Sequence, residues 1–235
     1  MRAANLIARA TEAEPLQRRV LADHAYERLK ELILDRHIEP DSWMAIDVLA
    51  RDLGVSPTPI REALGRLESD GLVLKMENGR YRTEPLLTLA SFEQLYDVRL
   101  QLEPFAAGQA AEHISDEELA HLREVEQSMH AAPTGSVYAQ FAQFTAGNEG
   151  FHEIIAKAAR NQFLYDAIDR LHSHHRLAQL YLHHGIVDAA PAIEEHMAIV
   201  AALVARNSSA ARDLMRAHIE RSRRELQPLI ADAVG

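Results

Sequence analysis

Residues 49 to 73, LARDLGVSPTPIREALGRLESDGLV, constrain the fold of this chain more than any other segment. A short helix with apolar positions on one side ends at Gly54, because glycine readily takes the left-handed conformation that a tight turn needs. Ser56 is suited to cap the next helix and Pro57 to occupy its first position. A second helix therefore follows the first after a turn of a few residues, which is the arrangement of a helix-turn-helix.

The flanking segments complete a small winged domain. Apolar residues from Leu21 to Leu34 recur with helical spacing and predict a helix before the turn. After Gly71, two β-prone runs flank Asn78-Gly79, a dipeptide typical of two-residue hairpin turns. We therefore predict a winged helix-turn-helix, with three helices plus a β-hairpin wing, over residues 20–85. Residues 1–19 are predicted to be a flexible N-terminal arm.

Residues 86–235 are predicted to form a second domain built from helices alone. Six stretches have helical patterns, and no strand pattern lies between them. These stretches are residues 88–112, 115–130, 135–159, 161–183, 189–205 and 208–231. Pro104 lies inside the first stretch and is expected to kink or break it. The predicted fold class is mainly α, with an all-α helical bundle after the winged domain.

The composition excludes several classes of protein. The chain has no cysteine, which excludes disulfides, thiol catalysis and zinc–thiolate sites. No apolar run approaches the roughly 18 residues of a membrane span, so we expect no membrane partner and a cytoplasmic location. Residues 1–85 carry 13 Lys and Arg against 15 Asp and Glu. Any DNA affinity of this half must therefore come from individual basic residues, not from a general positive field.

The helix that begins at Pro57 carries the residues best placed to read DNA. The hydroxyls of Ser56 and Thr58 lie at its start, where side chains and backbone amides can bind phosphate. Arg61 follows one turn later and can donate two hydrogen bonds to a guanine edge. The other candidates are Arg66 on the same helix and, in the wing, Asn78, Gly79 and Arg80. The alternative for Arg66 and for Arg80 is an ordinary exposed charge.

Histidines are concentrated in the second domain, where 11 of the 13 follow residue 86. Asn148 and His152 are four positions apart and so share one helix face, and His196 and His218 lie on two later helices. Three imidazoles and one oxygen with open positions would suit Zn²⁺, Ni²⁺ or a similar divalent ion. Spacing alone leaves open the alternative that these histidines are structural.

A second group of polar residues predicts an anion site. Tyr96, Arg99 and Glu103 are spaced three and four positions apart and share a helix face. A buried arginine can bind the carboxylate of a small effector through two hydrogen bonds. The alternative is an internal ion pair between Arg99 and Glu103, and both can hold at once. His175 is a further, weaker candidate for effector binding.

The residues around the turn resemble the DNA-binding domain of GntR-family regulators. The matching residues are Leu49, Ala50, Leu53, Gly54, Val55, Ser56, Thr58, Pro59, Arg61, Glu62, Ala63 and Leu64. Pro57 stands where the family signature has an arginine, and Asp47 lies where some members direct an arginine toward DNA. The resemblance implies operator binding, and the two departures imply a different operator or weaker binding to each half-site.

The second half resembles the helical FCD ligand-binding domain of the FadR-type branch of this family. The matching residues are Val98, Arg99, Glu103, Phe151, His152, Ala159, Arg160, Asn161, Gln162, Glu195, His196 and His218. Members with these histidines commonly hold a divalent metal through one aspartate and three histidines. The resemblance implies His152, His196 and His218 as ligands, with Asn148 at the aspartate position. An amide there leaves more of the ion's charge uncompensated, which predicts weaker metal binding and stronger attraction for an anionic effector.

These inferences predict a ligand-responsive transcriptional regulator, a repressor by resemblance, and not an enzyme. It would bind an inverted-repeat operator as a homodimer and be released by a small organic-acid effector. One alternative is a metal-sensing regulator, in which the ion is the signal. Another is a helical metalloenzyme, which would need a general base near the metal. Glu149 and Glu195 adjoin the histidines in sequence and are expected to project to other faces.

Overall fold

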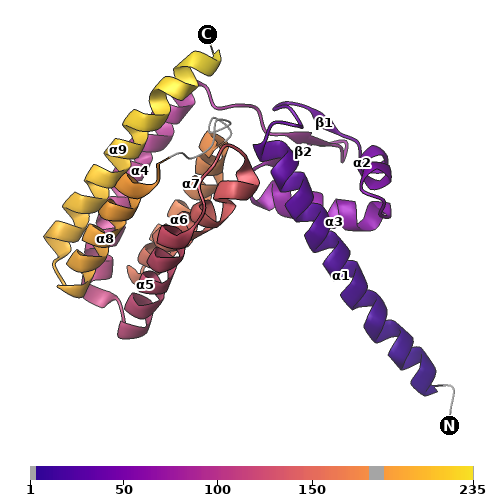
Figure 1. Ribbon diagram of the computed structural model, residues 1–235, viewed down its shortest axis with the longest axis horizontal. Coiled ribbons are helices and arrows are strands. Elements are labelled where there is room, and N and C mark those ends of the chain that lie inside the picture. Colours follow the sequence, from indigo (N-terminus) through magenta and orange to yellow (C-terminus); the bar gives the residue numbers. More distant parts are fainter. Residues whose placement is uncertain (1–3, 180–187, 235) are drawn as a thin grey trace. The chain divides into compact units, whose positions relative to one another are not determined.

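The computed structural model describes residues 4–179 and 188–234 of the chain, with side chains described for residues 19–171 and 188–231. The chain divides into two compact units, residues 1–86 and 87–235 (Figure 1). No helix in the described part of the chain is both long enough and apolar enough to span a bilayer.

The N-terminal unit is a winged helix-turn-helix, which confirms the predicted fold class. Its helices are α1 (Ala4–Leu34), α2 (Ile46–Asp52) and α3 (Pro57–Ser69). Its strands are β1 (Trp43–Met44), β2 (Val73–Lys75) and β3 (Tyr81–Thr83), antiparallel in the order β1-β3-β2. Strand β1 was not predicted, because a strand of two residues has no periodicity of its own and exists only through its pairing with β3.

Helix α3 packs against α1 through a continuous apolar face. Ile60, Leu64 and Leu67 of α3 are fully buried, as is Leu29 of α1. Burying such side chains contributes about 1.5–3 kcal/mol each. This packing holds α3 against the unit while its opposite residues, including Arg61, stay exposed.

Helix α1 begins at Ala4 and therefore includes most of the residues for which a flexible arm was predicted. The arm and the first predicted helix are therefore one helix in this structure. Residues such as Leu6, Ala8 and Arg9 have good helix propensity, whereas Pro15 lies inside the helix and removes one of its backbone hydrogen bonds. Residue 20 is not a boundary of secondary structure.

The wing turn also differs in detail. Met76 N donates to Arg80 O at 2.8 Å, and Gly79 N donates to Met76 O at 2.8 Å. The connection is thus a three-residue loop, and not the two-residue turn that Asn78-Gly79 predicted. Gly79 has a φ of +77°, the left-handed conformation that ends such a loop and that glycine adopts without strain.

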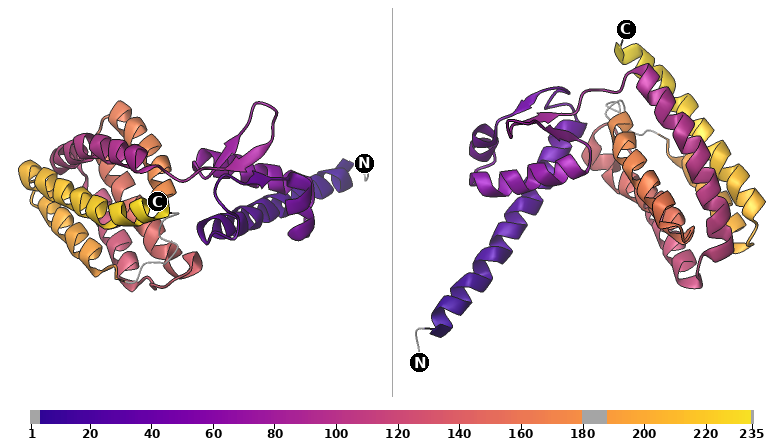
Figure 2. Two further views of the ribbon diagram at one scale, coloured as in Figure 1. Left: turned by 90° about the horizontal axis from the view of Figure 1, so that it is seen from above. Right: turned by 180° about the vertical axis from the view of Figure 1, so that it is seen from behind.

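The C-terminal unit is all helical, as predicted. Its helices are α4 (Leu89–His113), α5 (Asp116–Ala131), α6 (Tyr138–Ala158), α7 (Gln162–Gln179), α8 (Ala190–Val204) and α9 (Ser208–Val234). Helices α4 and α9 lie side by side along much of their length (Figures 1 and 2). Pro104 does not break α4, which continues through it as one helix.

Local polar contacts set where several of these helices begin. Ser115 and Glu118 form a capping box at the start of α5. Glu118 also accepts two hydrogen bonds from Arg160, at 2.9 and 2.6 Å. Arg160 has a φ of +55°, and Asn161 caps α7 by accepting from Leu164 N at 3.2 Å. The turn between α6 and α7 is thereby tied to α5.

Candidate functional site

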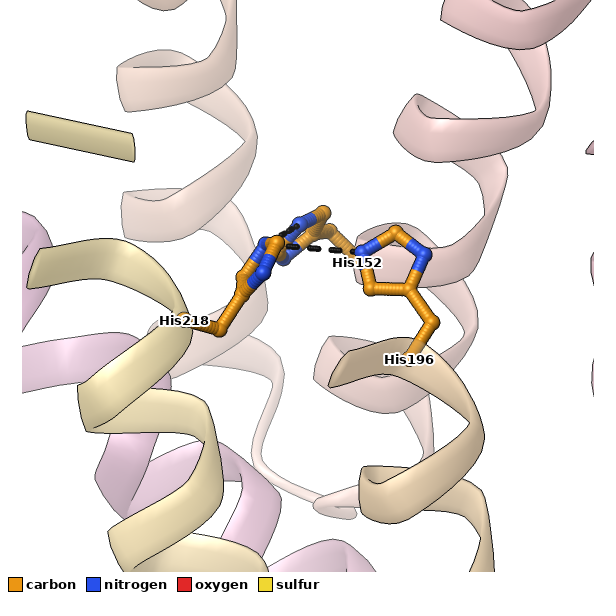
Figure 3. A group of neighbouring side chains, drawn as sticks. All are labelled: His152, His196 and His218. Atoms are coloured by element: carbon orange, nitrogen blue, oxygen red, sulfur yellow. Dashed lines mark hydrogen bonds between the residues drawn. The ribbon is translucent and has the colours of Figure 1, made fainter. Parts of the chain in front are cut away.

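Three histidines meet inside the C-terminal unit, each from a different helix (Figure 3). His152 comes from α6, His196 from α8 and His218 from α9. Their exposed fractions are 4%, 0% and 4%. One ring nitrogen from each lies within 4.8 Å of the others. The spacing along the sequence placed them on separate helices, and the structure brings them together.

The distances between the ring nitrogens fit a metal site. His218 Nε2 lies 3.3 Å from His152 Nε2 and 3.4 Å from His196 Nε2. Ligand nitrogens at ~2.0–2.1 Å from a tetrahedral Zn²⁺ are ~3.3–3.4 Å apart by simple geometry. Two of the three edges of the cluster therefore match a tetrahedral ion without rearrangement.

His152 is oriented by a carboxylate from α4. Its Nδ1 lies 2.8 Å from Glu103 Oε2, and Glu103 Oε1 accepts from Arg99 Nε at 2.6 Å. A proton on His152 Nδ1 would face this carboxylate and would leave a lone pair on Nε2. Both Arg99 and Glu103 are only 3% exposed at the side chain. The predicted internal ion pair is therefore present.

His218 is oriented in the same manner by a carboxylate that sequence reasoning missed. Its Nδ1 lies 2.7 Å from Glu195 Oε2, and Glu195 Oε1 accepts from Arg221 Nε at 2.6 Å. The expectation that Glu195 projects away from the histidines is wrong, because Glu195 on α8 faces His218 on α9. The sequence did show a carboxylate, Glu195, directly before His196. Its partner His218 lies 23 positions away, so spacing along one helix could not reveal the contact.

The electrostatics of this second contact favour an ionised Glu195. Burial alone would raise the pKa of Glu195, but the hydrogen bonds from His218 and Arg221 outweigh burial and lower it. An ionised Glu195 can only accept, so the Nδ1 of His218 donates to it, and the Nε2 of His218 lies 3.3 Å from the Nε2 of His152. If both rings were neutral and protonated at Nδ1, two lone pairs would lie 3.3 Å apart, and a proton or a metal ion between them would remove their repulsion.

His196 is held by an aromatic ring. Phe151 stacks on it with centroids 4.0 Å apart and planes 11° apart. Burial first, and then the nearby His218, His152 and Arg221, hold the pKa of His196 well below its ordinary value. His196 is therefore neutral at pH 7, which is the state that binds a metal. Its Nδ1 has no hydrogen-bond partner among the described residues.

The remaining residues predicted for this site, Asn148, Tyr96 and His175, differ in how deeply they are buried and in whether the structure describes their side chains. Asn148 is half-buried on α6, one turn before His152. Tyr96 is fully buried, with its hydroxyl 2.8 Å from Ser222 Oγ and its ring 4.9 Å from the Arg99 guanidinium. His175 belongs to α7, but its side chain lies outside the described residues.

Arg99 keeps one donor without a partner. Its Nη1 is buried and makes no hydrogen bond to the residues that the structure describes. Buried polar groups of native proteins are rarely left unsatisfied, and an unpaired guanidinium donor is costly. An anionic group bound beside Arg99 would satisfy it.

The predicted DNA-reading residues fall into two groups. Ser56 and Arg61 are exposed and Thr58 is half-buried on the first turns of α3. Ser56 occupies the N-cap position but makes no capping hydrogen bond through its side chain. Its hydroxyl is thus not used by the helix. In the wing, Asn78 and Arg80 are exposed.

Arg66 is engaged with α1. Its Nη1 lies 2.5 Å from Asp23 Oδ1, and its guanidinium carbon lies 3.9 Å from the centroid of the Tyr26 ring. Tyr26 in turn donates to Asp70 at the end of α3. These contacts join α3 to α1, a structural role that was not among the roles predicted for Arg66, which were a DNA contact and an ordinary exposed charge.

The family to which this chain belongs follows from comparison with known proteins. Residues 94–221 match the model of the FCD domain, and residues 21–82 match that of bacterial regulatory proteins of the gntR family. The chain belongs to the GntR family and carries an FCD domain. The two matches fall in the two compact units, one in each.

Individual relatives agree with this membership. The GntR-family chain is 26% identical over 208 residues to the HTH-type transcriptional regulator YdhC of Bacillus subtilis, covering 88% of this chain and 91% of YdhC. It is 27% identical to the Nta operon transcriptional regulator of Aminobacter aminovorans, covering 84% and 90%. The fold is similar to that of E. coli McbR/YncC, with a TM-score of 0.68 at 22% identity, over 88% and 96% of the two chains.

Membership of the GntR family decides the class of function. The protein is a transcriptional regulator with a DNA-binding winged helix-turn-helix, and not an enzyme. The metalloenzyme alternative is therefore wrong. The buried histidines are a candidate metal site of the FCD domain, with a chemistry that fits a divalent ion.

Proposed function

We propose that this regulator is a repressor of a metabolic operon, which binds an inverted-repeat operator as a homodimer and is released by a small carboxylate effector. The effector would bind beside a divalent metal ion such as Zn²⁺ or Ni²⁺. The observation that carries the proposal is the buried convergence of His152, His196 and His218 within 4.8 Å, with carboxylates orienting two of them.

The donor set supports a metal held by the three Nε2 atoms, with Asn148 as a possible fourth ligand through its side-chain oxygen. Neutral imidazoles oriented by carboxylates at Nδ1 are the usual surroundings of a metal-binding histidine. A bound ion would supply positive charge that none of the three neutral ligands compensates. An anionic effector would be attracted to that charge.

Arg99 supports the same class of effector from the protein side. Its Nε is used by Glu103, while its Nη1 has no hydrogen-bond partner in the described structure. A carboxylate would accept from that donor in a charge-assisted hydrogen bond. Tyr96, whose ring lies beneath the Arg99 guanidinium, and Glu103 would position Arg99 for this contact.

The DNA-binding half of the proposal rests on α3. Ser56 and Thr58 would bind phosphate at the start of the helix, and Arg61 would read a base edge. One helix-turn-helix reads a half-site, so an inverted repeat requires two copies of the chain. That the Aminobacter relative is named as the regulator of an operon supports control of an operon here as well. We place the protein in the cytoplasm, where its operator is.

The first test is metal analysis of the purified protein beside a variant with His152, His196 and His218 replaced by alanine. Near-stoichiometric metal in the wild type, absent from the variant, is the expected result. A matched control replaces three exposed histidines of the same unit, His113, His121 and His130, and should keep the metal. A wild type that carries no metal, and binds none when offered Zn²⁺ or Ni²⁺, would refute the metal site.

Operator binding on the same samples separates the two kinds of regulator. A DNA duplex selected by the wild-type protein from a random-sequence library serves as the probe. If chelation leaves binding to this duplex intact, the ion belongs to the effector site, as we propose. If chelation alone releases the duplex, the protein senses the metal itself.

A further inference from the structure

Trp43, the single tryptophan of the chain, lies on the wing. Its side chain is 48% exposed, whereas the neighbouring Met44 is 4% exposed and belongs to the core. Trp43 pairs with Arg82 across β1 and β3, so both side chains are on the solvent face of the sheet. The core of the unit does not account for a large aromatic side chain at this position.

Two arginines gather on this indole. The guanidinium carbon of Arg80 lies 4.0 Å from the ring centroid of Trp43, and that of Arg82 lies 5.8 Å from it. Arg82 is also paired with Asp41. Among the residues that the structure describes, no carboxylate pairs with Arg80. The charge of Arg80 is therefore held against an aromatic face and not neutralised.

The backbone of Arg80 is fixed as well. Arg80 directly follows Gly79 at the tip of the wing, and its N–H donates to Asn78 Oδ1 at 3.0 Å. Its carbonyl accepts from Met76 N at 2.8 Å. Backbone and guanidinium are thus both preorganised at the end of an exposed hairpin. A long flexible arginine held in this way loses less conformational freedom when it binds a partner.

We infer that Trp43 is a positioning residue for DNA binding: it holds the Arg80 guanidinium at the wing tip, ready to contact a phosphate or the minor groove. The inference rests on the proposed operator binding and adds a second contact to that of α3. Because the unit as a whole has no excess of positive charge, its attraction for a polyanion depends on individually placed cations such as Arg80.

The test is a double-mutant cycle on the full-length protein, using the duplex selected by the wild type. Arg80→Ala should weaken binding and lower the slope of log K against log salt by about 1. Trp43→Ala should weaken binding about 2- to 5-fold, the effect expected of an exposed cation–π contact. In the Arg80→Ala background, the same Trp43→Ala change should have no further effect.

Two controls keep the result interpretable. Trp43→Phe retains an aromatic face and should bind the duplex more tightly than Trp43→Ala does. It also replaces Trp43→Ala in the cycle if the alanine variant unfolds the wing. Phe163→Ala removes an 88% exposed aromatic side chain from α7 in the other unit and should leave DNA binding unchanged.

Because Trp43 is the single tryptophan, its fluorescence should change on adding the duplex to wild type, and change less in Arg80→Ala.

Additive losses in the cycle, or tryptophan emission that the duplex does not alter, would overturn the positioning role. In that case the wild type would still bind its selected duplex, so the proposed function would stand. A wild type that selects no duplex from the library would overturn both.

Discussion

His218 Nδ1 lies 2.7 Å from Glu195 Oε2, and this contact repeats the one between His152 and Glu103. In both cases the second carboxylate oxygen accepts from an arginine Nε at 2.6 Å, from Arg221 or from Arg99. Two arginine–glutamate–histidine chains thus converge on one cluster from different helices. The contact of Glu195 with His218 is a hydrogen bond that fixes the ring orientation and proton position of His218, whereas Glu103 lies at ion-pair distance from His152.

Glu195→Gln should weaken metal binding about 10- to 100-fold while the fold is retained, because His218 loses the carboxylate that orients it and raises its basicity. Competition against a chelator of known affinity measures the effect. The matched control is Glu194→Gln, which removes the same charge from the exposed neighbour on α8. Equal affinities in both variants would show that the Glu195 contact does not act on the metal.

Asn148→Asp should tighten metal binding and weaken the response to a carboxylate effector, because a carboxylate ligand compensates charge that the amide leaves exposed. Titrating metal and then following release of the selected duplex by a panel of small carboxylic acids measures both effects. Gln101→Glu introduces the same charge on the exposed face of α4 and should change neither. Unchanged metal affinity in Asn148→Asp would exclude residue 148 as a ligand.

Arg99→Lys should abolish the effector response and leave both metal binding and DNA binding in place. Lysine keeps the charge beside Glu103, but it lacks the guanidinium, whose Nε can donate to Glu103 while its Nη1 donates to an effector. Arg99→Ala should instead destabilise the C-terminal unit by about 3–5 kcal/mol, since it leaves the Glu103 carboxylate buried without its cation. Thermal unfolding distinguishes the two variants, and a Lys variant with a normal effector response would contradict the assignment.

Arg61 and Arg66 lie on one helix and should behave differently when replaced by alanine. Arg61→Ala should cost about 1–3 kcal/mol of binding to the selected duplex and relax its sequence preference. Arg66→Ala should leave sequence preference intact and lower the stability of the N-terminal unit by about 1 kcal/mol, through loss of the Asp23 and Tyr26 contacts. Duplex selection and thermal unfolding of both variants check this, and a changed preference in Arg66→Ala would restore its predicted DNA role.

Much of the fold could be read from local patterns. The turn at Gly54, the helix start at Pro57 and the hairpin around Gly79 each depend on a few adjacent residues whose backbone preferences are strong. The all-helical second unit followed from apolar periodicity in the same way. The two errors were also local in origin. Strand β1 is too short to show an alternating pattern, and a three-residue hairpin loop has almost the same composition as a two-residue loop.

For the site, the sequence by itself determined which residue types were available and on which helix each lies. It placed His152, His196 and His218 on three helices, and it left Arg66 and Arg99 with two roles each. Only the tertiary structure decided that the three imidazoles meet, that Glu195 faces His218 and that Arg66 lies on Tyr26. The physical reason is that helical spacing fixes neighbours three or four positions apart, whereas contacts across helices depend on how apolar faces pack against one another.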